Sequence, residues 1–185
     1  ARTDEVLFYL AFNLMDVGED REALDKYKGL VKSFPQSAYV ADGYLAIGEY
    51  YFDRNQAFTA LNNYKKAASY ENTNIYGFAT YKLGWCYYNV GEYKDAIAAM
   101  KEVVANSQDL EAGKLSLKED ALKDLVLFCA ESKDIEGAYE YFTRYADPKY
   151  YKASLKRLAA FYIEQSNFKQ AIVTYRDLIA QDPLA

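Results

Sequence analysis

The chain has 185 residues, about half of them hydrophobic and a quarter charged, so it can bury a packed core and does not belong to the intrinsically disordered class. It has no histidine, which excludes His-dependent nucleophilic or acid–base catalysis and imidazole metal ligation. The formal net charge is −5 and lysines are interspersed with acidic residues, so nucleic acid is not an expected partner.

Motifs that carry chemistry are sparse. Cys86 and Cys129 form no C-x-x-C pair, so no zinc site is indicated; we expect buried thiols, with a disulfide as the alternative. Ser166 and Lys169 match S-x-x-K, but at a predicted turn and without a companion motif. No glycine-rich phosphate loop and no membrane-spanning apolar run occur. We therefore predict no catalytic, cofactor-binding or metal-binding residue, and no enzyme.

In chain order, small residues recur at intervals of 33 to 42 residues, each with large residues around it at helical spacing. Ala23, for example, is followed by Tyr27 and Leu30. The same frame surrounds Ala60, Ala96, Ala138 and Ala171. Each unit is predicted to be two antiparallel helices that approach closely at the small residue. The predicted helices are 4–17, 20–34, 38–53, 56–70, 75–90, 93–107, 117–132, 135–146, 149–165 and 168–181.

Turn residues agree with these helices. Gly18, Asn55 and Gly91 lie between the two helices of their units, where a chain reversal is needed. Eight extra residues, Glu111 to Lys118, separate the third and fourth units and include Gly113. We expect this insertion to be a loop and the most flexible point of the chain.

The segment Leu83-Gly84-Trp85-Cys86-Tyr87, followed by Gly91, Tyr93 and Ala96, resembles the pattern of the tetratricopeptide repeat (TPR) family. The resemblance covers essentially the whole chain. It implies an all-α solenoid of five helix–turn–helix repeats, about ten antiparallel helices, in a right-handed superhelix. We expect one domain, 1–185, with repeats at 4–37, 41–74, 77–110, 119–151 and 152–185 and the insertion at 111–118.

One segment also resembles a bacterial subgroup. Phe34-Pro35-Gln36-Ser37, followed by Ile47-Gly48-Glu49-Tyr50-Tyr51-Phe52, is similar to a run found in bacterial envelope TPR proteins, both BamD-like outer-membrane assembly lipoproteins and periplasmic Tol–Pal coordinators. The resemblance implies a periplasmic scaffold in a cell-envelope assembly. A cytoplasmic adaptor or peptide receptor is the alternative, and a signal in the native upstream sequence would separate the two.

The TPR resemblance also implies where a ligand lies. The first helix of each repeat lines the concave groove, and five positions of that helix face the ligand. In the first three repeats these positions are mainly aromatic and acidic. In the last two they have no aromatic residue and carry lysines. The predicted groove residues are Phe8, Phe12, Met15, Asp16, Leu45, Glu49, Phe52, Asp53, Phe78, Tyr81, Trp85, Tyr88 and Asn89.

An aromatic and acidic groove suits a protein or peptide partner with apolar and basic residues. The alternative is that these side chains only pack between helices. The Lys/Asn pairs with which chaperone-binding TPR domains grip a terminal carboxylate are missing at the matching positions, so such a clamp is not expected.

The C-terminal end suggests a third possibility. The chain begins abruptly and is interpreted as an excised fragment, and it stops where a sixth repeat or a polar capping helix would begin. We therefore expect the face built by Ile172, Tyr175 and Ile179 to be partly exposed or covered by another molecule. Self-association through this uncapped repeat would make the chain a self-assembling structural protein.

Overall fold

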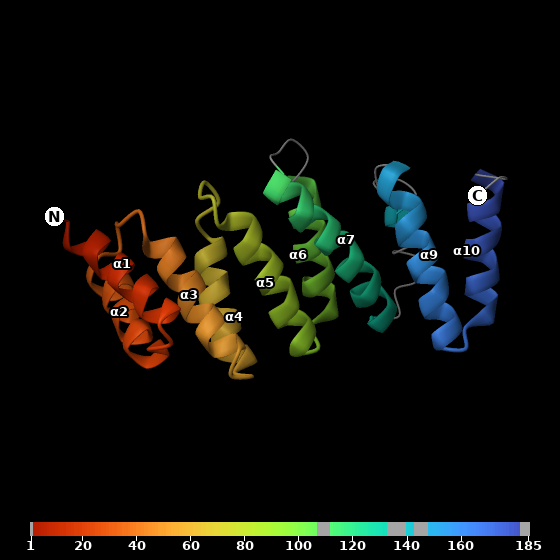
Figure 1. The fold of residues 1–185 in the computed structure, drawn as a ribbon. Coiled ribbons are helices and arrows are strands. Elements are labelled where there is room, and N and C mark those ends of the chain that lie inside the picture. Colours follow the sequence, from red (N-terminus) through yellow and green to blue (C-terminus); the bar gives the residue numbers. More distant parts are fainter. Residues whose placement is uncertain (1, 107–111, 133–139, 143–147, 182–185) are drawn as a thin grey trace. The chain divides into compact units, whose positions relative to one another are not determined.

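The computed structural model describes residues 2–106, 112–132, 140–142 and 148–181 (Figure 1). These residues contain helices and no strand, so the predicted all-α class is confirmed. In the part described, no helix is both long and apolar enough to cross a membrane. The helices are α1 (Thr3–Asp16), α2 (Asp20–Ser33), α3 (Val40–Phe52), α4 (Ala57–Ala68), α5 (Tyr76–Asn89), α6 (Tyr93–Asn106), α7 (Ala112–Glu131), α9 (Pro148–Glu164) and α10 (Phe168–Gln181).

Most predicted helix ends lie within one or two residues of those observed. The predicted insertion loop is the exception, because α7 begins at Ala112 and residues 112–118 are helical. This prediction was wrong for a physical reason: apart from Gly113 the segment consists of good helix formers and serine, and no proline stops the helix. Most of the helix expected at 135–146, including Ala138, lies outside the described residues. The only part of it that the structure describes, residues 140–142, is helical.

Two compact units, residues 1–92 and 93–185, make up the chain. In the first unit, α1 packs on α2, α2 on α3, α3 on α4 and α4 on α5. Ala23 and Ala60 are completely buried where two helices of a repeat meet, as the sequence pattern predicts. Gly48 of α3 is also buried, against the Tyr64 ring of α4. The core is therefore a row of small interhelical clusters, each joining neighbouring helices.

The turns within repeats share one backbone design. Gly18 and Gly91 have a φ of 82°, and Asn55 and Ser166 have φ values of 56° and 59°. In each case the next residue donates its N–H to the carbonyl five residues earlier, as Glu19 does to Leu14. This left-handed residue with its backward hydrogen bond is the Schellman ending of a helix. It ends the helix and allows the next helix to begin after a connection of only three or four residues.

In the second unit, α6 packs on α7, α7 on α9 and α9 on α10. Ala96, Ala159 and Ala171 are buried, so these small residues again lie in the interior. Cys86 of the first unit and Cys129 of the second are both buried side chains. The prediction of a single domain over 1–185, with its repeat boundaries, stays a prediction.

Candidate protein-binding face

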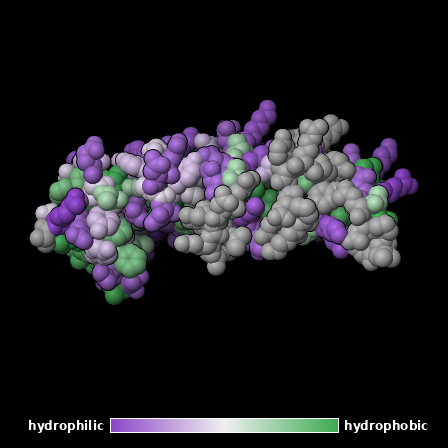
Figure 2. Space-filling model, turned by 90° about the horizontal axis from the view of Figure 1, so that it is seen from above, coloured by the Kyte–Doolittle hydropathy of each residue, from purple (hydrophilic) through white to green (hydrophobic). Residues whose placement is uncertain are grey.

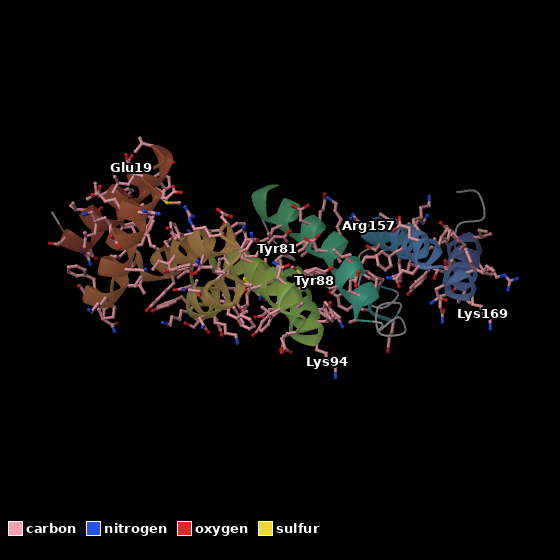
Figure 3. All side chains as sticks on the ribbon, turned by 90° about the horizontal axis from the view of Figure 1, so that it is seen from below. Glu19, Tyr81, Tyr88, Lys94, Arg157 and Lys169 are labelled. Atoms are coloured by element: carbon pink, nitrogen blue, oxygen red, sulfur yellow. The ribbon has the colours of Figure 1, made fainter. Side chains whose placement is uncertain are left out.

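The thirteen predicted groove residues all lie in the first unit, on α1, α3 and α5 or directly after α3. We call these thirteen residues the first-helix face. None of them belongs to the fully buried core, and Phe12 and Phe78 are 50% and 40% exposed. Figure 3 labels Tyr81 and Tyr88, both on α5. A second molecule can therefore reach every part of this face without unfolding the chain.

An aromatic cluster lies on α1. The Phe8 ring stacks on Tyr39, with centroids 4.6 Å apart, and Phe12 lies beside it at 6.5 Å. Tyr9 contacts both Phe8 and Tyr39 at its edge, and the Tyr39 hydroxyl donates to Glu5. Figure 2 shows hydrophobic and hydrophilic side chains intermingled at the N-terminal end of the chain. Rigid aromatic surface of this kind suits an apolar anchor of a partner.

The middle of the face is held by a charged network. The Glu49 carboxylate on α3 accepts a hydrogen bond from the buried Tyr64 hydroxyl on α4. Its other oxygen accepts from the Lys82 ammonium on α5, with Nζ and Oε2 2.9 Å apart. Burial, followed by the Glu49 contact, raises the pKa of Tyr64, so this phenol remains a donor. Glu49 thus joins three helices.

Two rings flank the same ammonium. The Lys82 Nζ lies 5.3 Å from the centroid of Phe52 and 5.3 Å from that of Phe78. Both distances are within the range of cation–π attraction. Further along α5, Trp85 meets Tyr88 edge to face at 5.6 Å. The structure thus brings Glu49, Phe52 and Phe78 together around a lysine that the repeat positions did not single out.

Three polar residues lie at the C-terminal ends of the first helices of the three repeats. Asp16 and Asn89 end α1 and α5, and Asp53 caps α3. All three are exposed, so the face carries two carboxylates that water and a partner can reach. By contrast, Phe8, Met15, Leu45 and Phe52 also pack against the buried clusters beneath them. Packing and accessibility therefore coexist on this face.

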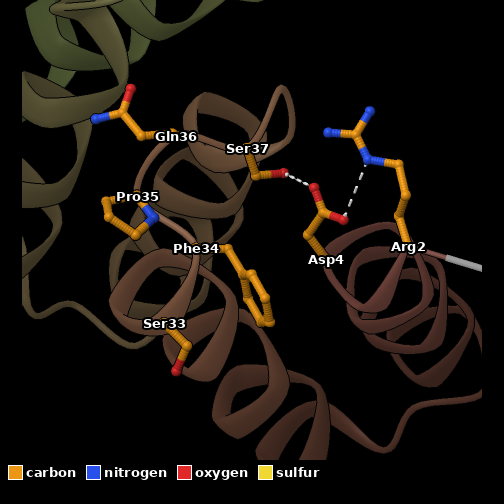
Figure 4. Close-up of a pocket in the computed structure, with 7 residues that line it drawn as sticks. All are labelled: Arg2, Asp4, Ser33, Phe34, Pro35, Gln36 and Ser37. Atoms are coloured by element: carbon orange, nitrogen blue, oxygen red, sulfur yellow. Dashed lines mark hydrogen bonds and ion pairs between the residues drawn. The ribbon is translucent and has the colours of Figure 1, made fainter.

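A pocket of about 360 Å³ lies between the start of α1 and the turn that follows α2 (Figure 4). The Ser37 hydroxyl donates to the nearly buried Asp4 carboxylate at 2.7 Å, and Arg2 lies 3.7 Å from the same carboxylate. The Ser37 bond holds the pKa of Asp4 below its usual range. The remaining lining residues are Ser33, Phe34, Pro35 and Gln36. Ser37 thus attaches the turn between α2 and α3 to α1.

Sequence reasoning missed Lys82, Tyr39 and the Asp4–Ser37 pair. Lys82 could have been found, because it lies four residues after Phe78 and three before Trp85, on one side of α5. Tyr39 precedes α3 and left no periodic signal. The Asp4–Ser37 bond joins residues 33 apart, and no local pattern identifies such a pair.

The sequence pattern of the tetratricopeptide repeat family matches residues 5–37, 78–109 and 154–185, just over half of the chain. A comparison with curated proteins gave no significant match. Several solved structures share the fold. A tetratricopeptide repeat protein from Parabacteroides merdae is 15% identical, with a TM-score of 0.68, over 100% of this chain and 68% of that one.

Two further structures are similar at comparable identity. MamA from Desulfovibrio magneticus is 15% identical, with a TM-score of 0.66, over 97% of this chain and 95% of that one. YrrB, described as a TPR protein with an unusual peptide-binding site, is 18% identical, with a TM-score of 0.63, over 96% of this chain and 86% of that one. At such identities the likeness shows the fold alone.

Proposed function

The chain belongs to the tetratricopeptide repeat family, and from this premise we propose that it is a scaffold that binds a partner protein along the first-helix face. The observation that carries the proposal is the accessibility of this face. Of its large aromatic side chains, Phe12 and Phe78 are exposed and Trp85 is partly exposed.

The chemistry of the face favours a partner segment with apolar anchors and basic residues. Aromatic side chains bury large areas and dominate binding energy at protein interfaces. Asp16 and Asp53 add exposed negative charge at two helix ends, which attracts lysine or arginine and speeds association. YrrB, whose published description names a peptide-binding site, supports binding of a peptide-like segment on this fold.

Replacing Trp85 by alanine should weaken binding at least tenfold, as expected for a central aromatic anchor. The measurement is a fluorescence titration with a peptide selected on the chain from a random 12-residue library. Phe58→Ala is the matched control, because Phe58 is 72% exposed on α4, outside the first-helix face. Loss of thermal stability in Trp85→Ala without loss of affinity would contradict the assignment and leave Trp85 a packing residue.

We further propose that the scaffold works in a bacterial cell envelope, in the periplasm, with a cytoplasmic adaptor as the alternative. The support is the resemblance of the Phe34–Ser37 segment to envelope proteins of this family. Fractionation of the native cells, with an antibody against this chain, tests the compartment. Recovery in the cytoplasmic fraction would favour the adaptor.

A second candidate function is self-assembly. Ile172, Tyr175 and Ile179 of α10 are 50%, 38% and 63% exposed, as predicted. Their counterparts in α2, counted from the reference alanines, are Leu24, Tyr27 and Val31, and α3 covers that face. An α3-like helix therefore fits the face of α10. In α1, Val6 and Leu10 stand where α3 has Gly43 and Ile47, and both are exposed.

If α1 of a second copy covers α10, the contact is head-to-tail and extends into a chain of copies. Sedimentation of this chain should then show mass rising with concentration, and Ile172→Glu should abolish the rise. Phe58→Glu, at an exposed hydrophobic residue outside both faces, is the control and should change nothing. A concentration-independent monomer would exclude this candidate.

A further inference from the structure

We propose that Glu49, Phe52 and Phe78 form a slot for an arginine side chain of the partner, and that Lys82 fills this slot until the partner binds. The inference rests on the proposed function, because it assumes that a segment lies along the first-helix face. It goes further by naming the side chain that the middle of the face selects. Lys82 then acts as an internal substitute for the ligand.

The contacts of Lys82 describe the slot. Its ammonium lies 2.9 Å from the Glu49 carboxylate and 5.3 Å from each of the Phe52 and Phe78 ring centroids. Two aromatic faces and a carboxylate around one point make a cation site. The slot is also pre-organised, because the Tyr64 hydroxyl holds the second oxygen of Glu49 and the Phe52 ring packs on the Tyr64 ring.

Lys82 can leave the slot. The Lys82 and Glu49 side chains are 20% and 29% exposed, so the ion pair is open to water on one side. An ion pair that water can reach on one side is weaker than a fully buried one, because water competes for both charges. The lysine stem is long and flexible, and it can carry the ammonium into solvent without disturbing α5. The helices that frame the slot stay in place.

Arginine fits the slot better than lysine does. A guanidinium is planar, so it can stack on the rings while its N–H groups point at the carboxylate. It is also more weakly hydrated than an ammonium, and it loses less on entering an aromatic site. The exposed Asp53, next to Phe52 in sequence, adds negative charge beside the slot. A partner arginine is therefore favoured over Lys82 and over a partner lysine.

The first experiment selects 12-residue peptides from a random library on the wild-type chain, on Glu49→Gln and on Lys82→Met. Arginine should be enriched among wild-type binders relative to the unselected library, and it should lose this enrichment on Glu49→Gln. Binders without an arginine preference would overturn the slot and leave the proposed function standing. Failure to select any binder would overturn both.

The second experiment titrates one arginine-containing binder. Lys82→Met removes the competing ammonium but keeps most of the stem, so affinity should rise roughly two- to six-fold, the gain expected from freeing a site occupied through a weak ion pair. Lys65→Met is the matched control, because Lys65 of α4 lies 5.0 Å from the Tyr87 ring, outside the first-helix face. It should leave the affinity unchanged.

Two results would overturn the proposal. Weaker binding to Lys82→Met, or enrichment of acidic peptides that Lys82→Met abolishes, would show that Lys82 itself contacts the partner. If Lys82→Met fails to fold, the proposal is tested on the wild-type chain by measuring its affinity for the same peptide with citrulline in place of arginine. Citrulline keeps the shape and removes the charge, so affinity should fall about tenfold or more. An unchanged affinity would refute the slot.

Discussion

Raising the pH from 9 to 12 should lower the free energy of unfolding by roughly 5 kcal/mol, enough to unfold a typical small domain. Burial raises the pKa of the Tyr27 phenol and that of the Cys86 thiol, each to about 12, and these two groups account for the stated loss; the raised pKa of the Tyr64 phenol adds to it. The folded chain therefore keeps these protons at a pH where the unfolded chain releases them. The stabilisation is complete below pH 9 and is lost as the pH rises through 12.

Urea unfolding at a series of alkaline pH values measures this loss. Tyr27→Phe removes one of the contributing groups, so this variant should lose roughly 2 kcal/mol less than the wild-type chain over the same range. Tyr175→Phe, at a more exposed tyrosine, is the control and should follow the wild-type curve. Equal losses in wild type and Tyr27→Phe would mean that deprotonation of Tyr27 does not couple to unfolding.

Gly48→Ala should destabilise the chain by about 2 kcal/mol, although alanine is the better helix former. A Cβ at position 48 would lie 2.7 Å from two atoms of the Tyr64 ring. The ring cannot move aside easily, because it is completely buried and its hydroxyl is bonded to Glu49. The two helices must therefore separate, which disturbs the cluster around Ala60 and Cys86.

Gly29→Ala is the matched control, since it makes the same chemical change within α2. No atom lies within 4 Å of a Cβ built at position 29, so only the helix preference remains. Gly29→Ala should stabilise the chain by about 1 kcal/mol. Chemical denaturation of the two variants measures both changes in the free energy of unfolding, which should have opposite signs. If both substitutions stabilise the chain to the same extent, α3 does not approach Tyr64 as closely as described.

The sequence predicted the helices and their small contact residues well, because both depend on spacing along the chain. Ala60 and Gly48 mark the contact of α3 with α4 through their size alone. The start of α7 was missed, because a chain of good helix formers gives no signal for where a helix begins. Helix ends depend on weak local preferences that tertiary packing can override.

The hydrogen-bonded network within the first-helix face was not predictable from repeat positions. The bond between Lys82 and Glu49 joins two repeats, and its geometry depends on how α3 and α5 pack against α4. Repeat positions described Glu49 as a residue that faces a ligand. They could not show that its carboxylate is already bonded to Tyr64 and Lys82, which changes the partner chemistry we propose.

The side-chain bonds described above that join different helices in the first unit connect residues no more than 34 positions apart. The Tyr64–Glu49 bond spans 15 residues, and the Arg54–Asp20 pair spans 34. Bonds of such short range cost little loop-closure entropy, so this unit should fold quickly and form its contacts in many possible orders. Under a pulling force it should also unfold gradually, one helix pair after another, and so extend at low force.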